Sequence, residues 1–276
     1  RANPRLVYGR MTGWGQDGPL ASRAGHDINY VALSGVLGML GRSGERPTPP
    51  LNIIGDMGGG GLLLAFGMVC ALLEAQRSGR GQVVDASMVE GSALLASTVY
   101  ELRAAGWWSE RRGSNLLDSG APFYEVYATA DGGFMAVGAI EPPFYVALLD
   151  GLGLAAADLP AQLDSAAWPQ LKERFAEIFS TRTRAEGSET FEGTDACVTP
   201  VLTLAEAALH PHNTERQAFL RPDGVLQAAP APRFSRSRPE MRLPPPEPGE
   251  HTAAVLGEFG FGTEEIAALR RAGAIA

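Results

Sequence analysis

The feature that most constrains the fold is an uncharged, apolar stretch of 17 residues, Met57–Leu73, which opens with a run of glycines. A membrane-spanning helix usually needs about 18–20 apolar residues, so a buried helix of a globular protein is the better interpretation. The pattern predicts this helix over about residues 60–77, with Gly79 and Gly81 ending it. Because the helix is apolar nearly all round, we expect it to be buried. The sequence QVVDAS that follows is typical of another buried strand.

Charge and reactive residues exclude several classes of protein. The net charge of −8 argues against a surface for nucleic acid or for an anionic membrane. Two cysteines, Cys70 and Cys197, are too few for a disulfide framework or a zinc quartet, which suits a reducing compartment. The chain has one lysine, Lys172, in WPQLKERFAEIF, where the pattern predicts the solvent-facing side of an amphipathic helix. Schiff-base chemistry therefore has no good candidate.

Hydrophobic periodicity outlines the rest of the chain. It predicts a strand over 5–9, a helix that starts at Asp27, a long helix over about 87–107, and two strands in FYEVYATADGGFMAVGAI joined at Asp131-Gly132-Gly133. Further helices are expected at about 143–150, 168–180 and 184–192, followed by a strand in CVTPVLTL and a short helix ending near His210. The proline-rich residues 226–250 are typical of a connector, and the last residues have helical patterning.

Two glycine-rich motifs resemble phosphate-binding loops. Residues 13–18, GWGQDG, fit G-x-G-x-x-G, but the last glycine does not open a helix and no acidic residue follows about 20 positions later, as a dinucleotide site requires. A tight loop packed near a backbone is the preferred interpretation. GDMGGGG at 55–61 lacks the Lys-Ser/Thr of a P-loop, and close packing of a helix against a sheet explains it better.

Three residues stand at element ends where chemistry is possible. His26 lies where a loop meets a helix, and the free N–H groups of a helix start can hold a developing oxyanion. Asp56 lies at a turn beside glycines that allow close approach, and Glu141 follows a strand and precedes two prolines. Each also has an ordinary explanation as a cap or a solvated helix start, and spacing alone does not bring them together. A metal at His210-Pro211-His212 is disfavoured, because no carboxylate is near.

At these residues the chain resembles a known family. The matching stretches are GRMTGWGQDGPLASRAGHDINYVALSG, PTPPLNIIGDMGGGG, SGRGQVVDASMVEG, GAPFYEVYATADGGFMAVGAIEP, DACVTPVLTLAEA followed by HPH, APAPRFSRS, and the tail from GEHTAAVLG. They are similar to the α-methylacyl-CoA racemases of the family III CoA-transferase (CaiB/BaiF) superfamily, in order over nearly the whole chain. Family members begin with roughly another hundred residues, so the resemblance implies that an N-terminal segment is missing here.

The resemblance implies a mechanism. His26 and Asp56 would flank the carbon beside the thioester and interconvert (2R)- and (2S)-2-methylacyl-CoA by 1,1-proton transfer through an enolate. Glu141 would hydrogen-bond the imidazole, and the backbone N–H of Asp27 would donate to the enolate oxygen. The segment Gly25, His26, Asp27, Ile28, Asn29 and Tyr30 would touch the CoA thioester arm. No cofactor is implied, because CoA is part of the substrate. A histidine suits this work because its ordinary pKa is about 6.5, whereas an aspartic acid needs partial desolvation to hold a proton.

The family also implies an architecture. A large Rossmann-like α/β domain would comprise residues 1–86 and 231–276, and a smaller α/β domain would comprise 126–216. Residues 87–125, with the long helix, and 217–230 would be linkers. Two subunits would form a homodimer of interlinked rings, in which Glu141 reaches His26 across the dimer. No membrane span is expected. The ending GAIA is not a peroxisomal signal, so a cytoplasmic location is expected.

Two alternatives remain open. One is a CoA-transferase of the same superfamily, in which an aspartate at position 56 is a nucleophile that forms acyl-enzyme anhydrides. Such enzymes generally lack the histidine of AGHD and the glutamate of AIEP, and this chain has both. The other is a non-catalytic remnant that binds CoA poorly or serves as a dimerising scaffold. The retained acid and base residues argue against that alternative for the whole protein.

Overall fold

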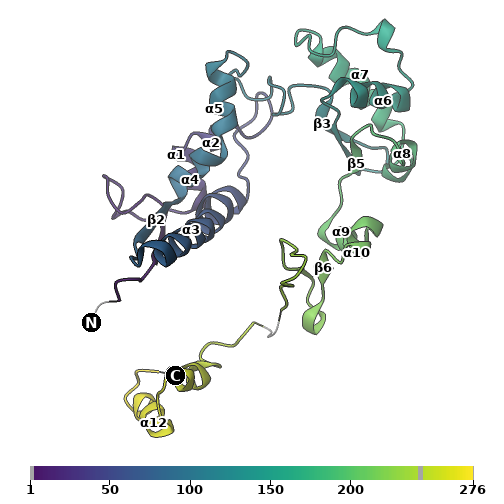
Figure 1. Cartoon of the computed structure of the whole chain (residues 1–276). Coiled ribbons are helices and arrows are strands. Elements are labelled where there is room, and N and C mark those ends of the chain that lie inside the picture. Colours follow the sequence, from purple (N-terminus) through teal and green to yellow (C-terminus); the bar gives the residue numbers. More distant parts are fainter. Residues whose placement is uncertain (1–2, 242–244, 276) are drawn as a thin grey trace. The chain divides into compact units, whose positions relative to one another are not determined.

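The computed structural model describes residues 3–241 and 245–275 and forms two compact units, Arg1–Val201 and Leu202–Ala276 (Figure 1). The expected pairing of residues 1–86 with 231–276 in one domain remains a prediction, since these ranges fall in different units. Positions 1–2, 242–244 and 276 of that predicted domain lie outside the described residues.

The first unit is a mixed α/β structure. Its strands are β1 (Tyr8–Thr12), β2 (Val83–Ser87), β3 (Tyr124–Ala128), β4 (Phe134–Gly138) and β5 (Val198–Pro200). Its helices are α1 (Asp27–Leu33), α2 (Val36–Met39), the π-helix η1 (Ile53–Leu62), α3 (Leu63–Ser78), α4 (Met88–Leu95), α5 (Ser97–Ala104), α6 (Pro142–Leu152), the 3₁₀ turn η2 (Ala156–Asp158), α7 (Trp168–Ser180) and α8 (Arg184–Phe191).

Strands β1 and β2 are parallel, with Tyr8 opposite Val83 and Thr12 opposite Ser87. A parallel pair needs a crossover, which here runs through α1, α2, η1 and α3. The first strand begins three residues later than the expected range 5–9. The backbone N–H of Leu6 is used in a turn to Asn3, and the chain there contacts Gly81, so the strand ladder starts only at Tyr8.

Two of the expected helices form, but each is broken. The helix that starts at Asp27 is confirmed as α1 and continues as α2 after Gly35, whose φ of +84° is in the left-handed region that favours glycine. The helix expected over 87–107 is divided at Ala96 into α4 and α5 and ends at Ala104.

The glycines of GDMGGGG bring backbones close together, as the sequence predicts, although the nearest neighbour is a helix. A Cβ on Gly59 of η1 would lie 2.6 Å from the backbone N of Ser92 in α4. On the neighbouring residue, Gly60, a Cβ would lie 2.9 Å from Sδ of Met11 in β1. The π-helix thus fits between α4 and the first strand, and only glycine leaves the necessary space.

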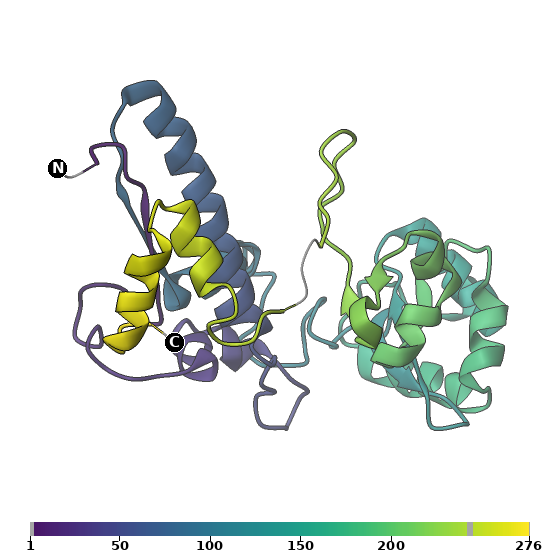
Figure 2. The ribbon, with the colours of Figure 1, turned by 90° about the horizontal axis from the view of Figure 1, so that it is seen from below.

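The expectation that the apolar helix is buried is wrong for this chain. Phe66, Val69 and Leu72 of α3 are 67%, 56% and 50% exposed. Among the described residues, α3 packs against β1, β2 and η1, and Figure 2 shows the helix running alongside the two strands. By length and composition Ile53–Ser78 could cross a membrane, and 17% of its most apolar window is buried. Strand β2 is likewise less buried than expected, with Val83 at 59% exposure.

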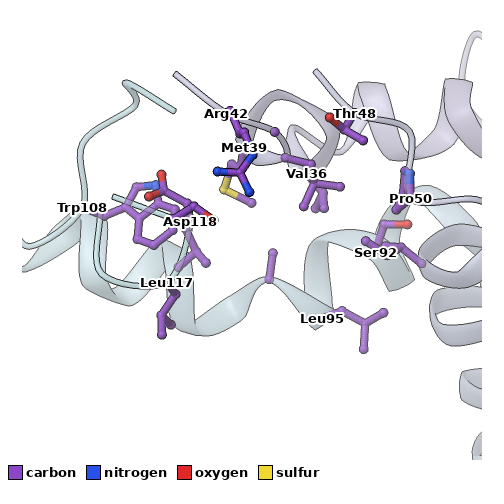
Figure 3. Close-up of a pocket in the computed structure, with 16 residues that line it drawn as sticks. Val36, Met39, Arg42, Thr48, Pro50, Ser92, Leu95, Trp108, Leu117 and Asp118 are labelled. Carbon is purple, nitrogen blue, oxygen red and sulfur yellow. The ribbon is translucent and has the colours of Figure 1, made fainter. Parts of the chain in front are cut away.

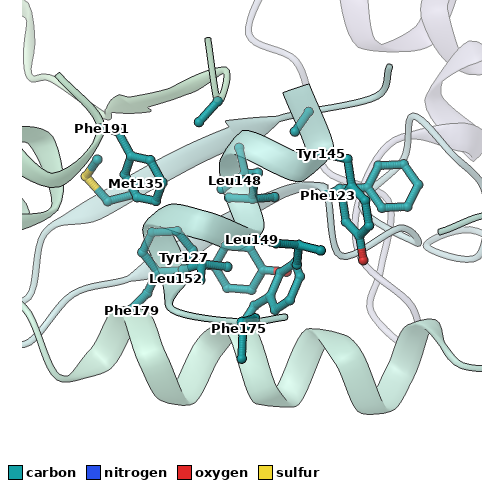
Figure 4. Packing of buried hydrophobic residues seen from close by; sticks show 14 of the residues in the cluster. Phe123, Tyr127, Met135, Tyr145, Leu148, Leu149, Leu152, Phe175, Phe179 and Phe191 are labelled. Atoms are coloured by element: carbon teal, nitrogen blue, oxygen red, sulfur yellow. The ribbon is translucent and has the colours of Figure 1, made fainter. Parts of the chain in front are cut away.

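The larger core of the first unit lies around a second sheet, in which β3, β4 and β5 are antiparallel. The predicted hairpin over Asp131–Gly133 is confirmed, with Tyr124 opposite Gly138. Helix α7 packs on this sheet, and Tyr127 of β3 stacks on Phe179 with ring centroids 5.0 Å apart (Figure 4). The buried side chains of the cluster include Phe123, Met135, Leu148, Leu149, Phe175 and Phe191.

An ion network around the buried carboxylate of Glu125 links this core to the loop after α2. Glu125 of β3, whose side chain is 2% exposed, binds Arg42 at 2.8 Å and Lys172 of α7 at 3.2 Å. The expectation that Lys172 faces solvent is therefore wrong, because its ammonium also donates to the carbonyl of Ser119. Burial by itself raises the pKa of Glu125, but the hydrogen bond from Arg42 and the charge of Lys172 lower it below its ordinary value.

The second unit consists of short elements. These are α9 (Leu204–Leu209), α10 (Pro211–Glu215), the antiparallel pair β6 (Phe219–Leu220) and β7 (Gln227–Ala228) with η3 (Pro222–Gly224) between them, α11 (Thr252–Glu258) and α12 (Thr263–Arg271). The helix ending near His210 and the helical C-terminal patterning are confirmed. Within the expected connector 226–250, β7 is the regular element that the described residues contain.

Candidate functional site

The glycine loop of residues 13–25 wraps around one tyrosine. The ring of Tyr30 occupies the space that a Cβ on Gly13 would need, and a Cβ on Gly25 would lie 2.8 Å from the same ring. Trp14 meets Tyr30 edge to face with centroids 4.7 Å apart, and the Tyr30 hydroxyl donates to the carbonyl of Gly25. No helix begins directly after Gly18, so the loop is a tight packing loop that leads to His26.

His26 is the N-cap residue of α1, with an extended backbone (φ −131°, ψ 171°). Its backbone N–H donates to Oδ1 of Asn29 at 3.0 Å, an arrangement that fixes the start of the helix. The residue itself is exposed. An imidazole anchored at its backbone and open to solvent can reach a bound substrate.

Asp56 lies in η1 and is half-buried. The backbone N–H of Asp56 donates to Oδ2 of Asp27 at 2.7 Å. The Asp56 side chain has a second neighbour, because Nδ2 of Asn52 lies 3.5 Å from Oδ2 of Asp56. Asp27 follows His26 directly, so this hydrogen bond brings the elements that carry His26 and Asp56 into contact. Spacing in the sequence gave no indication of this contact.

The electrostatic surroundings agree with that placement. Burial raises the pKa of Tyr30 above its ordinary value, and the negative charge of Asp56 raises it further. The negative charge of Asp56 thus disfavours ionisation of the tyrosine that anchors the glycine loop.

Glu141 lies in a different part of the first unit. It is the exposed N-cap residue of α6, and the prolines at positions 142 and 143 suit the first helical turn. The preceding carbonyl of Ile140 accepts a hydrogen bond from Gln162 at 2.7 Å, which fixes this end of the helix. Burial, then the charges of Glu141 and Asp195, raise the pKa of the Cys197 thiol. Among the hydrogen bonds of the described residues, none joins the Glu141 carboxylate to His26 or Asp56.

The sequence did not identify the side chains of Asp27 and Asn52 as neighbours of Asp56. The sequence predicts roles for Asp27 through its backbone N–H and within the segment that touches CoA, yet the residue is buried, at 7% exposure. The first residue of a helix is usually open to water, so the sequence carries little signal for this burial. Asn52 precedes Asp56 by four positions, one helical turn, which is the signal that could have identified it.

An apolar pocket of about 590 Å³ lies beside η1, the element that carries Asp56 (Figure 3). Its walls come from α2, the loop after α2, η1, α4, α5 and the connector that leads to β3. Ile54 of η1 lines it two residues before Asp56, and Arg42 and Asp118 are the charged residues in its wall. The buried hydroxyl of Ser92 also lines it and has no hydrogen-bond partner among the described residues.

The described residues contain no group of three or more histidine, cysteine, aspartate or glutamate side chains arranged to hold a metal ion. His210 and His212 flank the start of the short helix α10. The arrangement around His26 and Asp56 can instead offer an imidazole, a carboxyl group and backbone N–H groups to a substrate.

Comparison with known proteins gives consistent matches. The model of CoA-transferase family III matches residues 1–252. The chain is 55% identical to the α-methylacyl-CoA racemase of Mus musculus and 51% identical to that of Homo sapiens, in each case over 96% of this chain and 70% of the relative. In structure it is similar to a CaiB/BaiF family protein from Brucella suis, with a TM-score of 0.74 and 24% identity, over 93% of this chain and 68% of that protein.

Proposed function

The chain belongs to CoA-transferase family III, and from its 55% and 51% identity to α-methylacyl-CoA racemases we propose that it is itself such a racemase. The reaction interconverts the (2R) and (2S) forms of a 2-methylacyl-CoA thioester. One observation on the site carries the proposal beyond the similarity. The Asp56 N–H donates to the Asp27 carboxylate, which places the carboxyl-bearing η1 against the start of the helix that carries His26.

The proposed reaction has two proton transfers at one carbon. One of the two residues, His26 or Asp56, removes the proton from C2, and the electron pair moves onto the thioester oxygen to form an enolate. The other residue, in its protonated form, then delivers a proton to the opposite face of C2, and the thioester is restored. No group other than these two changes its protonation, so the reaction needs no cofactor, and CoA enters as part of the substrate.

The enolate oxygen needs hydrogen-bond donors that are already in place. We assign this role to the backbone N–H of Asp27, at the start of α1. The segment Gly25–Tyr30 is proposed to line the thioester arm of CoA. Its fixed geometry supports this assignment, because Tyr30 holds the Gly25 carbonyl and Asn29 holds the His26 N–H.

We propose that the active form is a homodimer in which Glu141 of one subunit hydrogen-bonds His26 of the other. Within one chain, Glu141 is exposed at the N-terminus of α6, and it belongs to the part of the unit built on β3–β5. The exposed apolar side chains of α3 are compatible with a protein that buries further surface on association.

The experiment measures both hydrogen exchange and stereochemistry. The protein is incubated with one epimer of a 2-methylacyl-CoA in deuterium oxide, and deuterium at C2 is followed together with the appearance of the other epimer. A racemase incorporates deuterium and scrambles the configuration. A parallel incubation with a free carboxylic acid detects transfer of CoA. Transfer without exchange at C2 would refute the proposal and favour Asp56 as a nucleophile.

A further inference from the structure

The buried carboxylate of Asp27 connects the two elements that carry the acid and base residues. Its Oδ2 accepts the backbone N–H of Asp56 at 2.7 Å, across 29 positions of sequence. Asp27 is 7% exposed, so the bond is shielded from competing water. A hydrogen bond to a charged acceptor is among the stronger ones in a protein, at about 1.5–3 kcal/mol.

The residue before Asp56 is shaped by this contact. A Cβ on Gly55 would lie 2.5 Å from Oδ2 of Asp27 and 3.1 Å from Cγ2 of Val31. Gly55 is itself buried, so neither side can move away easily. Only a residue without a side chain lets the π-helix approach α1 closely enough for the hydrogen bond to form.

The second carboxylate oxygen supports a role beyond stability. Oδ1 of Asp27 is buried, and no described residue donates a hydrogen bond to it. Leaving a buried polar atom unpaired costs about 1–3 kcal/mol, so an aspartate is a poor choice here if the position serves only packing. The carboxylate instead lies at a hydrogen bond that joins the elements of His26 and Asp56.

We propose that the side chain of Asp27 is a positioning residue, which sets the location of Asp56 relative to His26. This inference rests on the proposed racemase function and deepens it. The two proton-transferring groups must stand on opposite faces of one carbon, and a misplacement of about 1 Å can reduce a rate by about 100-fold. Asp27 holds the backbone of Asp56 and leaves the Asp56 carboxyl group free to face the substrate.

The proposal has a signature in the exchange assay. A racemase that loses one of its two groups still exchanges the C2 hydrogen of the epimer that the remaining group deprotonates, but it no longer inverts the carbon. Displacing Asp56 should imitate that loss. In Asp27→Ala, we expect racemisation to fall about 100-fold. Exchange that starts from the epimer deprotonated by His26 should fall much less.

Two further variants separate positioning from folding. Asp27→Asn keeps an acceptor oxygen for the Asp56 N–H, and it should restore racemisation to within about tenfold of the unsubstituted protein. Gly55→Ala leaves both carboxylates in place but crowds Oδ2, and it should reproduce the Asp27→Ala pattern. Gly61→Ala is the matched control in the same π-helix, since its Cβ would meet only the Asp56 carbonyl, at an ordinary 3.4 Å.

The outcomes are distinguishable. If the unsubstituted protein exchanges no C2 hydrogen, the proposed function itself fails. If that protein exchanges and racemises, but Asp27→Ala lowers racemisation and both exchange rates by one common factor, Asp27 has only a structural role and the inference is overturned. A ratio of racemisation to His26-dependent exchange that falls in Asp27→Ala and Gly55→Ala, and recovers in Asp27→Asn, supports it.

Discussion

Gly59 of η1 and Gly91 of α4 touch backbone against backbone, with no side chain between them. A Cβ on Gly91 would overlap the carbonyl group of Gly59, and a Cβ on Gly59 would lie 2.7 Å from the carbonyl carbon of Gly91. This contact sets the position of the π-helix that carries Asp56, and it can be tested directly.

We predict that Gly91→Ala lowers the free energy of unfolding by about 1–3 kcal/mol, because the added methyl group forces the two helices apart. Denaturant unfolding measures the change. Gly38→Ala in α2 is the control, since a Cβ there meets nothing within 4 Å. The control should be neutral or stabilising by up to about 1 kcal/mol. Equal stabilities of the two variants would contradict the packing argument.

Substituting the two proton-transferring residues should give complementary defects. In His26→Ala and Asp56→Asn we expect racemisation to fall by about 1000-fold or more, since general acid–base groups contribute about 10²–10⁴-fold each. Each variant should still exchange the C2 hydrogen of one epimer, and the retained epimer should differ between the two. The measurement is deuterium incorporation from each pure epimer. A His26→Ala protein that still racemises and exchanges normally would remove histidine from the mechanism.

The proposed sharing of Glu141 between subunits predicts complementation. His26→Ala and Glu141→Ala should each be nearly inactive alone. Co-expressed with different affinity tags and purified through both tags, they should form mixed dimers in which one site carries both substitutions and the other carries neither. Such dimers should regain about half of the unsubstituted activity. If Glu141 acted on His26 of its own chain, both sites would remain defective and no activity would return.

The buried Glu125 network predicts a pH-dependent stability. Since the pKa of Glu125 is lowered in the folded protein, its stabilisation is present above the ordinary glutamate value of about 4.3 and is lost as the pH falls through the lower folded value. Removing both cations, in Arg42→Met with Lys172→Met, leaves a buried carboxylate. We expect a loss of about 2–3 kcal/mol at pH 7, less than for a wholly buried pair, because Arg42 is 50% exposed.

In that double variant, the contribution of Glu125 to stability should change with pH in the opposite direction. Burial alone raises the pKa of Glu125, so lowering the pH from 7 towards 4 should recover stability in the variant, whereas the unsubstituted protein gains none over that range from this group. Thermal unfolding at several pH values measures both trends. Glu110→Gln is the control, because the Arg103–Glu110 pair is exposed on both sides and should contribute little. Parallel pH profiles of the double variant and the unsubstituted protein would contradict the assignment.

Local patterns predicted the elements well and their burial poorly. The apolar spacing of α7 and the turn signal at Asp131–Gly133 identified a helix and a hairpin, because both depend on nearby residues. The exposure of Phe66 did not follow from the sequence, since apolar composition does not specify which surface of a helix another element covers. The π-helical form of residues 53–62 also has no periodic signature in the sequence.

In the candidate site, too, the sequence identified residues but not the contacts between them. The resemblance identified His26, Asp56 and Glu141 as candidates, but the hydrogen bond from Asp56 to the side chain of Asp27 joins residues 29 positions apart. The contact of Arg42 with Glu125 spans 83 positions. Such pairings depend on how elements pack in three dimensions, and the residue types alone are compatible with many other partners.

The engagement of Lys172 has a chemical consequence. Acyl thioesters transfer their acyl groups to free amines without any enzyme, and in proteins the ε-amino groups of lysine are the side chains that are acylated. This chain offers such reagents a single ε-amino group, and that group is ion-paired with Glu125 and hydrogen-bonded to the carbonyl of Ser119. These 276 residues therefore present activated acyl groups with almost no side-chain amine to modify by accident.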